Sequence, residues 1–324
     1  MRRDVEFKVE DGTILRGYFH SSQDSAAPVI VMAHNFSGVK EQIDPYAAYF
    51  ADGGFSVLVH DHRGFGGSDG TPRLELDASR QMADWRDAIS FALAQPEVDK
   101  TSGVLIWGSS FAGGLAMVVA AHDSRVRCVV SQIPHVSGHR NGREMFNVAQ
   151  RVRLNERFAA DRVARFSGAE PGRIPVFSVD PDELCALPPA MSHRYIESAL
   201  AQTPSWRNEV TLRSLQNSLE FEPAGWVRYI SPKPFLMIVA ANDTCTFPNL
   251  QLDVFGESKE PKRLVIHPGG HFDTYTDHFA LTSGAALDWF KEHLSKIAPA
   301  RLNCKAARDA GELSQPSDVD RNPS

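Results

Sequence analysis

Apolar residues in the first 130 positions fall into short continuous runs and longer segments with helical spacing. The short runs, each predicted to be a buried strand, are residues 29–32, 55–59, 104–107 and 126–130. The segments with helical spacing are residues 45–51, 76–94 and 111–121. Strands that alternate with helices in this way predict a parallel sheet with helices on both faces, which is the α/β class.

An antiparallel hairpin is expected ahead of this sheet. Polar and apolar residues alternate at positions 5–9 and again at 14–19, and Asp11-Gly12 between them is a tight-turn signal.

The alternation is lost between about residues 139 and 226 and resumes afterwards. This middle part has helical spacing at 145–164 and 192–201, and a structureless loop of such length would be unusual. We therefore predict an inserted, mainly helical cap at 139–229 between two parts of one core, residues 1–138 and 230–296. The second part contributes strands at 235–239 and 263–266 and helices at 249–255 and 280–294. Residues 297–324 are rich in Pro, Asp, Ser and Arg and are predicted to form a disordered tail.

Composition narrows the class of protein. The chain has 324 residues, of which 42% are hydrophobic and 23% charged, the balance of a soluble globular protein. A net charge of -6 and the lack of long Lys/Arg runs argue against nucleic-acid binding. No apolar stretch is long enough for a membrane span, and the N-terminus does not resemble a secretory signal. The four cysteines (Cys128, Cys185, Cys245 and Cys304) are scattered and predict free thiols in a reducing compartment, hence a cytoplasmic protein. The oligomeric state is not predicted.

Residues 107–114, WGSSFAGG, are the most informative segment of the chain. They join a predicted strand to a predicted helix, and a serine between small residues at such a junction is typical of a nucleophile elbow. Ser110 has Gly108 two positions before it and Ala112 two after, whereas Ser109 would require Trp107 in the tight turn. Ser110 is therefore the candidate nucleophile. The alternative is an ordinary serine at a helix N-terminus.

An acid and a histidine follow the last two predicted strands. Asp243 follows the strand at 235–239, and His271 follows the strand at 263–266 after Gly269-Gly270. The order Ser, Asp, His is the chain order expected for a hydrolase of this architecture, in which the histidine moves the serine proton and the carboxylate orients the imidazole. His267 and Asp273 are the local alternatives, and either candidate residue could instead belong to an ordinary turn.

An oxyanion site needs two backbone donors near the serine. We predict the N–H groups of Phe111, next to the nucleophile, and of Phe36, in the loop after the strand at 29–32. The alternative for this loop is a plain Asn-Ser-Gly turn. The glycine-rich residues 61–70 lack a full dinucleotide fingerprint, and no His/Cys/Asp spacing suggests a metal, so neither a cofactor nor a metal is expected.

Several of these segments together resemble the α/β-hydrolase superfamily over nearly all of residues 1–296. The segments are HNFSG at 34–38, DHRGFG at 61–66, WGSSF at 107–111 and GGHF at 269–272. More narrowly, DWRDAI at 84–89, the elbow and WRNEVTLRS at 206–214 resemble a branch with bacterial dienelactone-hydrolase-like proteins and the fungal polyketide transferase family. In similar enzymes glycine usually stands at the position of Asn35; asparagine tolerates a left-handed backbone better than most residues.

The resemblance implies an α/β-hydrolase fold with an inserted helical cap and a catalytic triad of Ser110, Asp243 and His271. It also implies action on ester or thioester bonds, in some members with transfer of a polyketide acyl chain to an alcohol in secondary metabolism. We predict a serine hydrolase that forms an acyl-enzyme with an apolar acyl substrate, free or bound to a carrier protein or CoA. An acyltransferase is the alternative, and a non-catalytic binding protein on the same scaffold is a third hypothesis. The candidate walls of the acyl pocket, which could instead be plain core, are Met145, Phe146, Phe158, Tyr195 and Trp206.

Overall fold

A mostly parallel sheet of eight strands forms the centre of the protein in a computed structural model, which describes residues 1–22, 26–178, 180, 182–187 and 203–297. The strands are β1 (Arg2–Lys8), β2 (Ile14–His20), β3 (Val29–Ala33), β4 (Ser56–His60), β5 (Val104–Ser109), β6 (Val126–Gln132), β9 (Phe235–Ala240) and β10 (Lys262–His267). Their order across the sheet is β1-β2-β4-β3-β5-β6-β9-β10. The pairs β1–β2 and β2–β4 are antiparallel and all the others are parallel, which confirms the predicted fold class.

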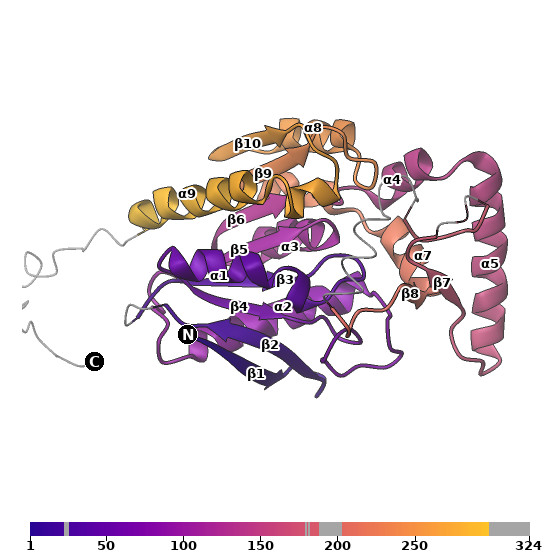
Figure 1. Cartoon of the computed structure of the whole chain (residues 1–324), viewed down its shortest axis with the longest axis horizontal. Helices are drawn as coiled ribbons and strands as arrows, with labels where there is room; N and C mark the ends of the chain where they lie inside the picture. Colours follow the sequence, from indigo (N-terminus) through magenta and orange to yellow (C-terminus); the bar gives the residue numbers. More distant parts are fainter. Residues whose placement is uncertain (23–25, 179, 181, 188–202, 298–324) are drawn as a thin grey trace, which may run out of the picture.

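Helices cover both faces of the sheet (Figure 1). Helices α1 (Asp44–Asp52) and α9 (Phe279–Ile297) pack on one face, where Ile30 and Met32 of β3 point. Helices α2 (Ala78–Ala94), α3 (Phe111–His122) and α8 (Pro248–Glu257) pack on the other face, where Val29 and Val31 point. Successive residues of a strand face opposite ways, so a strand buried on both faces must be apolar throughout. This explains the continuous apolar runs of the sequence.

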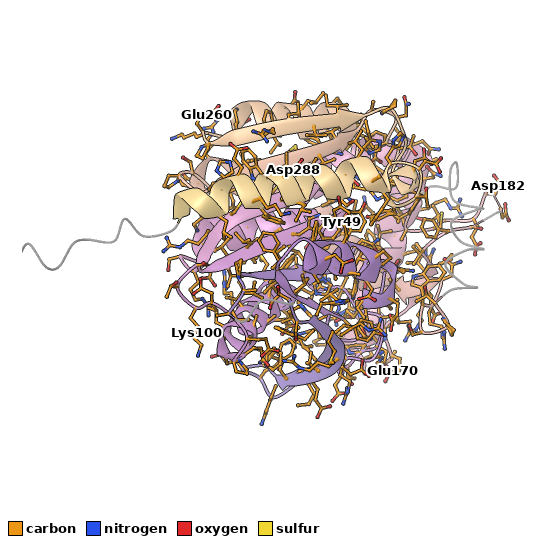
Figure 2. All side chains as sticks on the ribbon, turned by 60° about the vertical axis from the view of Figure 1, so that its left-hand side comes forward. Tyr49, Lys100, Glu170, Asp182, Glu260 and Asp288 are labelled. Carbon is orange, nitrogen blue, oxygen red and sulfur yellow. The ribbon has the colours of Figure 1, made fainter. Side chains whose placement is uncertain are left out.

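Helix α9 packs one side against the sheet and exposes the other side. Trp289 and Phe290 are buried against the sheet, whereas Asp288 on the outer side is exposed (Figure 2). Short 3-10 turns, η1 (Lys40–Gln42) and η4 (Phe272–Tyr275), lie in the loops that follow β3 and β10.

The segment between β6 and β9 forms its own group of elements at one end of the sheet (Figure 1). The elements are α4 (Gly138–Met145), α5 (Val148–Phe166), β7 (Arg173–Pro175), β8 (Glu209–Thr211) and α7 (Leu212–Glu220), and η3 (Pro223–Tyr229) then leads back to the core, where it packs on α3 and α8. Strands β7 and β8 form an antiparallel pair.

The helix expected at 145–164 is α5, which begins three residues later than predicted, and the separate helix α4 before it was not predicted. Phe146 has an extended backbone, with φ -112° and ψ 129°, and ends α4. Asn147 then begins α5, because its side chain accepts a hydrogen bond from the N–H of Gln150 while the Gln150 side chain accepts one from the N–H of Asn147. The pair β7–β8 and helix α7 had no clear signal in the sequence. The helix expected at 192–201 and nearly all of the predicted tail lie outside the described residues.

Two further features bear on the class of protein. None of the helices that the structure describes combines the length and the apolar character needed to cross a membrane. Cys128, Cys185 and Cys245 are free thiols and are buried, whereas Cys304 lies outside the described residues.

Candidate active site

Ser110 occupies the sharp turn between β5 and α3. Its backbone has φ 57° and ψ -122°, a conformation that is strained for any residue with a side chain. The turn is so tight that a Cβ on Gly108 would lie 2.1 Å from the carbonyl oxygen of Ala112. Gly108 therefore cannot be replaced by a larger residue without a shift of the backbone. Strain of this kind persists where the surrounding structure holds it in place, and it is common at functional sites.

The neighbouring Ser109 faces a different part of the protein. It is fully buried, and its hydroxyl shares a hydrogen bond of 2.7 Å with the hydroxyl of Tyr275. The side-chain amide of Gln132 also donates to it at 3.4 Å. Ser109 thus belongs to a buried polar network below the turn, whereas Ser110 borders two small cavities.

Asp243 lies after β9 and is held by four hydrogen bonds. Its Oδ1 accepts from the backbone N–H groups of Cys245, at 2.7 Å, and Thr246, at 2.8 Å. Its Oδ2 accepts from the Thr246 hydroxyl at 2.8 Å and from Nδ1 of His271 at 2.7 Å. With both oxygens engaged, the buried carboxylate has a single orientation, and that orientation faces the imidazole.

His271 lies in the loop after β10, and its tautomer follows from this contact. An ionised carboxylate can only accept, so the proton of the neutral ring is on Nδ1 and the lone pair is on Nε2. A lone pair on Nε2 is what a base needs to take a proton from a serine. His271 and Ser110 line the same cavity, which has a volume of about 20 Å³. The structure therefore joins His271 to Asp243 and brings His271 and Ser110 to one cavity.

The two local alternatives have other partners. Nδ1 of His267 accepts from the N–H of Gly269 at 3.2 Å, and its Nε2 contacts the Thr274 hydroxyl at 2.9 Å. Asp273 accepts from the N–H of Gly270 at 2.7 Å. Both side chains thus stabilise the loop that carries His271.

Both residues chosen as oxyanion donors border the same cavity as Ser110. Phe36 and Phe111 line a space of about 30 Å³ next to Ser110, which we call the Ser110 cavity. Phe111 is the first residue of α3, where a backbone N–H has no acceptor within the helix. Ser110 is among the few non-glycine residues described with positive φ, whereas Asn35 is not among them. Asparagine in place of the usual glycine therefore imposes no left-handed strain on this loop.

A buried histidine supports the loop that carries Phe36. His34 contacts the carbonyl oxygen of Asn35 through Nδ1 at 3.0 Å, and its Nε2 accepts from the N–H of His62 at 2.9 Å. This arrangement needs a neutral ring. Burial keeps the ring neutral, because burial lowers the pKa of His34 to about 3.

One cluster among the described residues has ligand types suited to a metal ion, namely Asp243, Cys245 and His271. The 2.7 Å between Oδ2 of Asp243 and Nδ1 of His271 is a hydrogen-bond distance, whereas two ligands about 2 Å from a tetrahedral ion lie roughly 3.3 Å apart. Burial also raises the pKa of the Cys245 thiol well above its usual range. The short contact between Asp243 and His271 is therefore a hydrogen bond between a carboxylate and an imidazole.

The proposed acyl-pocket residues divide between different cavities. Met145 lines the Ser110 cavity, and Trp206 lines the cavity that contains His271. Phe146 and Phe158 line a larger cavity between α4, α5 and α7. Tyr195 lies outside the described residues.

Sequence reasoning missed several residues that the structure brings to the site. Thr246 contacts both Asp243 and His271, and its spacing of three residues from Asp243 is that of a turn closed by an aspartate side chain. His135 lies after β6 and lines the Ser110 cavity, with Nε2 3.1 Å from the carbonyl oxygen of Ser218. Leu187 and Leu219 line the same cavity from the segment between β6 and β9.

Comparison with known proteins identifies the family. Residues 14–273 match the family described as X-Pro dipeptidyl-peptidase (S15 family). The chain belongs to this family of α/β-hydrolases. It is 31% identical to thiohydrolase aneE of Aspergillus aculeatus, over 95% of this chain and 96% of the relative. It is also 31% identical to polyketide transferase grgF of a Penicillium species, over 91% of this chain and 97% of the relative.

Solved structures agree with the sequence comparisons. The crystal structure of the α/β-hydrolase GrgF from Penicillium sp. sh18 superposes with a TM-score of 0.77 at 29% identity, over 91% of this chain and 99% of that one. The structure of DcsB in complex with its substrate analogue gives a TM-score of 0.81 at 26% identity, over 91% and 100%. The resemblance to the α/β-hydrolase superfamily and its fungal branch is confirmed, and the protein is an α/β-hydrolase enzyme.

Proposed function

We propose that this α/β-hydrolase is a serine thioesterase that cleaves acyl thioesters through an acyl-enzyme. One observation carries the proposal. Ser110 stands strained at the elbow and shares a cavity with His271, whose Nδ1 is hydrogen-bonded to Asp243. The names thiohydrolase and polyketide transferase of the relatives support a thioester substrate and a role in secondary metabolism.

The mechanism assigns one task to each group. Oγ of Ser110 attacks the thioester carbonyl and gives its proton to Nε2 of His271, while Asp243 stabilises the imidazolium that forms. The N–H groups of Phe36 and Phe111 hold the negative oxygen of the tetrahedral intermediate. The intermediate collapses, the C–S bond breaks, and His271 returns the proton to the leaving sulfur. Water then attacks the acyl-enzyme by the same steps, releasing the acid and restoring Ser110.

Residues 139–229 would act as a cap over this site. Met145, Leu187 and Trp206 from this segment border the small cavities at Ser110, which supports a role in substrate selection. The substrate would be an apolar acyl group presented on CoA or on a carrier protein. We place the enzyme in the cytoplasm, and the buried free thiols among the described residues support a reducing compartment.

Replacement of the nucleophile tests the proposal. Ser110→Ala is expected to lower kcat/KM for a p-nitrophenyl ester and for an acyl thioester by at least ~10³-fold. Ser109→Ala, one position away in the buried network, is the matched control and should retain turnover within about tenfold, a drop of about 1.4 kcal/mol in transition-state stabilisation. Equal rates for Ser110→Ala and the unchanged protein would favour the binding-protein hypothesis.

Acyl transfer is the second candidate, because it uses the same acyl-enzyme. The relatives named polyketide transferases support this second candidate. Incubation of a long-chain acyl thioester with and without an alcohol acceptor separates the two. Free acid as the main product in both reactions supports hydrolysis, whereas an ester that forms faster than the acid supports transfer.

A further inference from the structure

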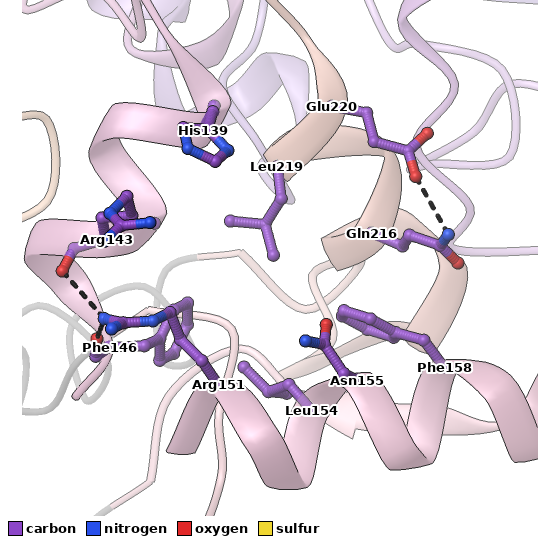
Figure 3. Close-up of a pocket in the computed structure, with 12 residues that line it drawn as sticks. His139, Arg143, Phe146, Arg151, Leu154, Asn155, Phe158, Gln216, Leu219 and Glu220 are labelled. Atoms are coloured by element: carbon purple, nitrogen blue, oxygen red, sulfur yellow. Dashed lines mark hydrogen bonds between the residues drawn. The ribbon is translucent and has the colours of Figure 1, made fainter. Parts of the chain in front are cut away.

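The space around Ser110 is too small for an acyl chain, but much more space lies nearby. The cavities that Ser110 borders have volumes of about 30 and 20 Å³. A third cavity, which we call the cap cavity, has a volume of about 380 Å³ and lies between α4, α5 and α7 (Figure 3). Only the cap cavity falls in the range of roughly 300–1,000 Å³ that is typical of sites for small organic ligands.

Leu219 separates the two spaces. It lies near the end of α7 and lines both the Ser110 cavity and the cap cavity. Figure 3 shows its side chain pointing into the middle of the cap cavity. The adjacent Gly142 of α4 leaves it room, since a Cβ there would lie 2.4 Å from Cδ2 of Leu219. Because Leu219 borders both cavities, the position of its side chain bears on the passage between them.

The cap cavity differs in chemistry between its ends. Its floor is apolar, with Leu154 and Phe158 of α5. Arg143 and Arg151 lie at one end, and Glu220, which accepts from Gln216 at 2.9 Å, lies at the other (Figure 3).

Arg143 and Arg151 carry positive charge that no carboxylate among the described residues neutralises. Arg151 is anchored, because its Nη1 donates to the carbonyl oxygens of Arg143 and Phe146. Within the part of the chain that the structure describes, neither Arg143 nor Arg151 forms an ion pair with a carboxylate. By contrast, Arg140 on the same helix as Arg143 is paired with Asp253 at 2.6 Å. A guanidinium without a carboxylate partner is suited to bind an anionic group of a ligand.

Building on the proposed function, we propose that the acyl chain of the substrate passes Leu219 into the cap cavity, and that its far end carries an anionic group bound by Arg143 and Arg151. The preferred substrates are thus thioesters of acyl chains with a distal acid rather than plain fatty acyl thioesters. Leu219 limits the length of the acyl chain that can enter the cap cavity, and the two arginines select a chain whose far end is negatively charged.

Substitutions of Leu219 test the path of the chain. The substrates are N-acetylcysteamine thioesters from acetyl to dodecanoyl, which contain no phosphate. Leu219→Trp is expected to lower kcat/KM for octanoyl and longer chains at least tenfold relative to its kcat/KM for acetyl. Leu219→Ala is expected to raise the rate with long chains relative to acetyl. Equal effects of both variants on all chain lengths would overturn the path, and thermal unfolding of each variant checks that the fold is intact.

Substitution of Arg143 tests the selection of charge. The probes are octanoyl and suberyl N-acetylcysteamine thioesters, which differ only in a distal carboxylate. The unchanged enzyme is expected to prefer the suberyl substrate at least tenfold, measured as the ratio of the two kcat/KM values, and Arg143→Gln is expected to bring this ratio close to one. Arg140→Gln, on the same helix, is the matched control and should keep the preference.

Two results would overturn the selection of charge. One is no preference for the suberyl substrate in the unchanged enzyme. The other is a loss of activity of Arg143→Gln with octanoyl-CoA that does not occur with the N-acetylcysteamine thioesters. That result would assign the arginines to a phosphate of the CoA arm. The proposed function fails separately, if the acetyl thioester is not hydrolysed or if Ser110→Ala hydrolyses it equally fast.

Discussion

Helices α3 and α5 illustrate the difference between the core and the segment between β6 and β9. In α3, ten of the 12 residues are buried, from Phe111 to Ala120, and the helix is enclosed by neighbours. In α5, which has 19 residues, the buried ones are Leu154 and Phe158. Val163 is 67% exposed and Phe166 is 94% exposed on the same helix. The core positions Ser110 rigidly, whereas α5 is packed on one side only and borders the cap cavity.

Specific polar contacts join the two parts. The Ser214 hydroxyl of α7 accepts from the N–H of Leu76 at 2.8 Å, and the N–H of Thr211 donates to the carbonyl oxygen of Leu74 at 2.9 Å. The guanidinium of Arg213 forms an ion pair with Glu75. The reaction would thus depend on the densely packed part, and the choice of substrate on a part that tolerates change. Four experiments test this division.

The largest effect is expected for the residue that orients His271. Asp243→Asn would keep the size of the side chain but favour the wrong tautomer of the imidazole, and kcat should fall on the order of 10³–10⁴-fold. Asp273→Asn is the control, because Asp273 serves the adjacent loop, and its loss should change kcat less than tenfold, about 1.4 kcal/mol. Similar losses in the two variants would contradict the assigned roles.

The next effect concerns folding rather than catalysis. Gly108→Ala places a Cβ against the backbone of α3 and should lower the free energy of unfolding by at least ~3 kcal/mol. Gly225→Ala in η3, where a Cβ would meet nothing within 4 Å, should change it by at most ~1 kcal/mol. Urea denaturation of both variants measures the difference. Equal midpoints would mean that the elbow is less tightly packed than the structure indicates.

Acid should destabilise the core through its buried histidines. Burial lowers the pKa of His34 to about 3 and those of His60 and His135 to about 4, so these rings stay neutral in the folded state. The unfolded chain takes up protons below the ordinary pKa of about 6.5. The contribution of these histidines to the free energy of unfolding is therefore fully present above pH 6.5. It is lost as the pH falls toward 4, by ~1.4 kcal/mol per pH unit for each histidine.

Urea midpoints between pH 8 and pH 5 measure this loss. His60→Gln should reduce the dependence of the midpoint on pH by the contribution of one proton, whereas His122→Gln, which replaces an exposed histidine, should change it much less. A midpoint that does not depend on pH in this range would show that the histidines are not held neutral.

The smallest effect is expected on the outer face of α5. Phe166→Ala should change the free energy of unfolding by no more than ~0.5 kcal/mol, because the ring is 94% exposed. Phe290→Ala, which removes a fully buried ring from α9, should cost ~3–5 kcal/mol and serves as the reference. A large loss for Phe166→Ala would mean that this face is covered in solution.

Much of the core could be predicted because its signals are local. A strand buried on both faces must be apolar along its whole length, as residues 29–32 are. The carboxyl ends of parallel strands meet at one edge of the sheet, so the residues that follow β5, β9 and β10 were expected to lie together. The requirement for a small residue at Gly108 selected Ser110 over Ser109 without any coordinates.

The sequence alone determined the fold class, the family and the residues proposed for the reaction, because each depends on short patterns in a fixed order. Only the tertiary structure decided the break at Phe146, the place of Thr246 beside Asp243 and His271, and the division of the acyl-pocket residues between separate cavities. These features arise where segments distant in the sequence pack together. Leu219 is the clearest case: one leucine among many becomes a partition only because α4 and α7 meet around it.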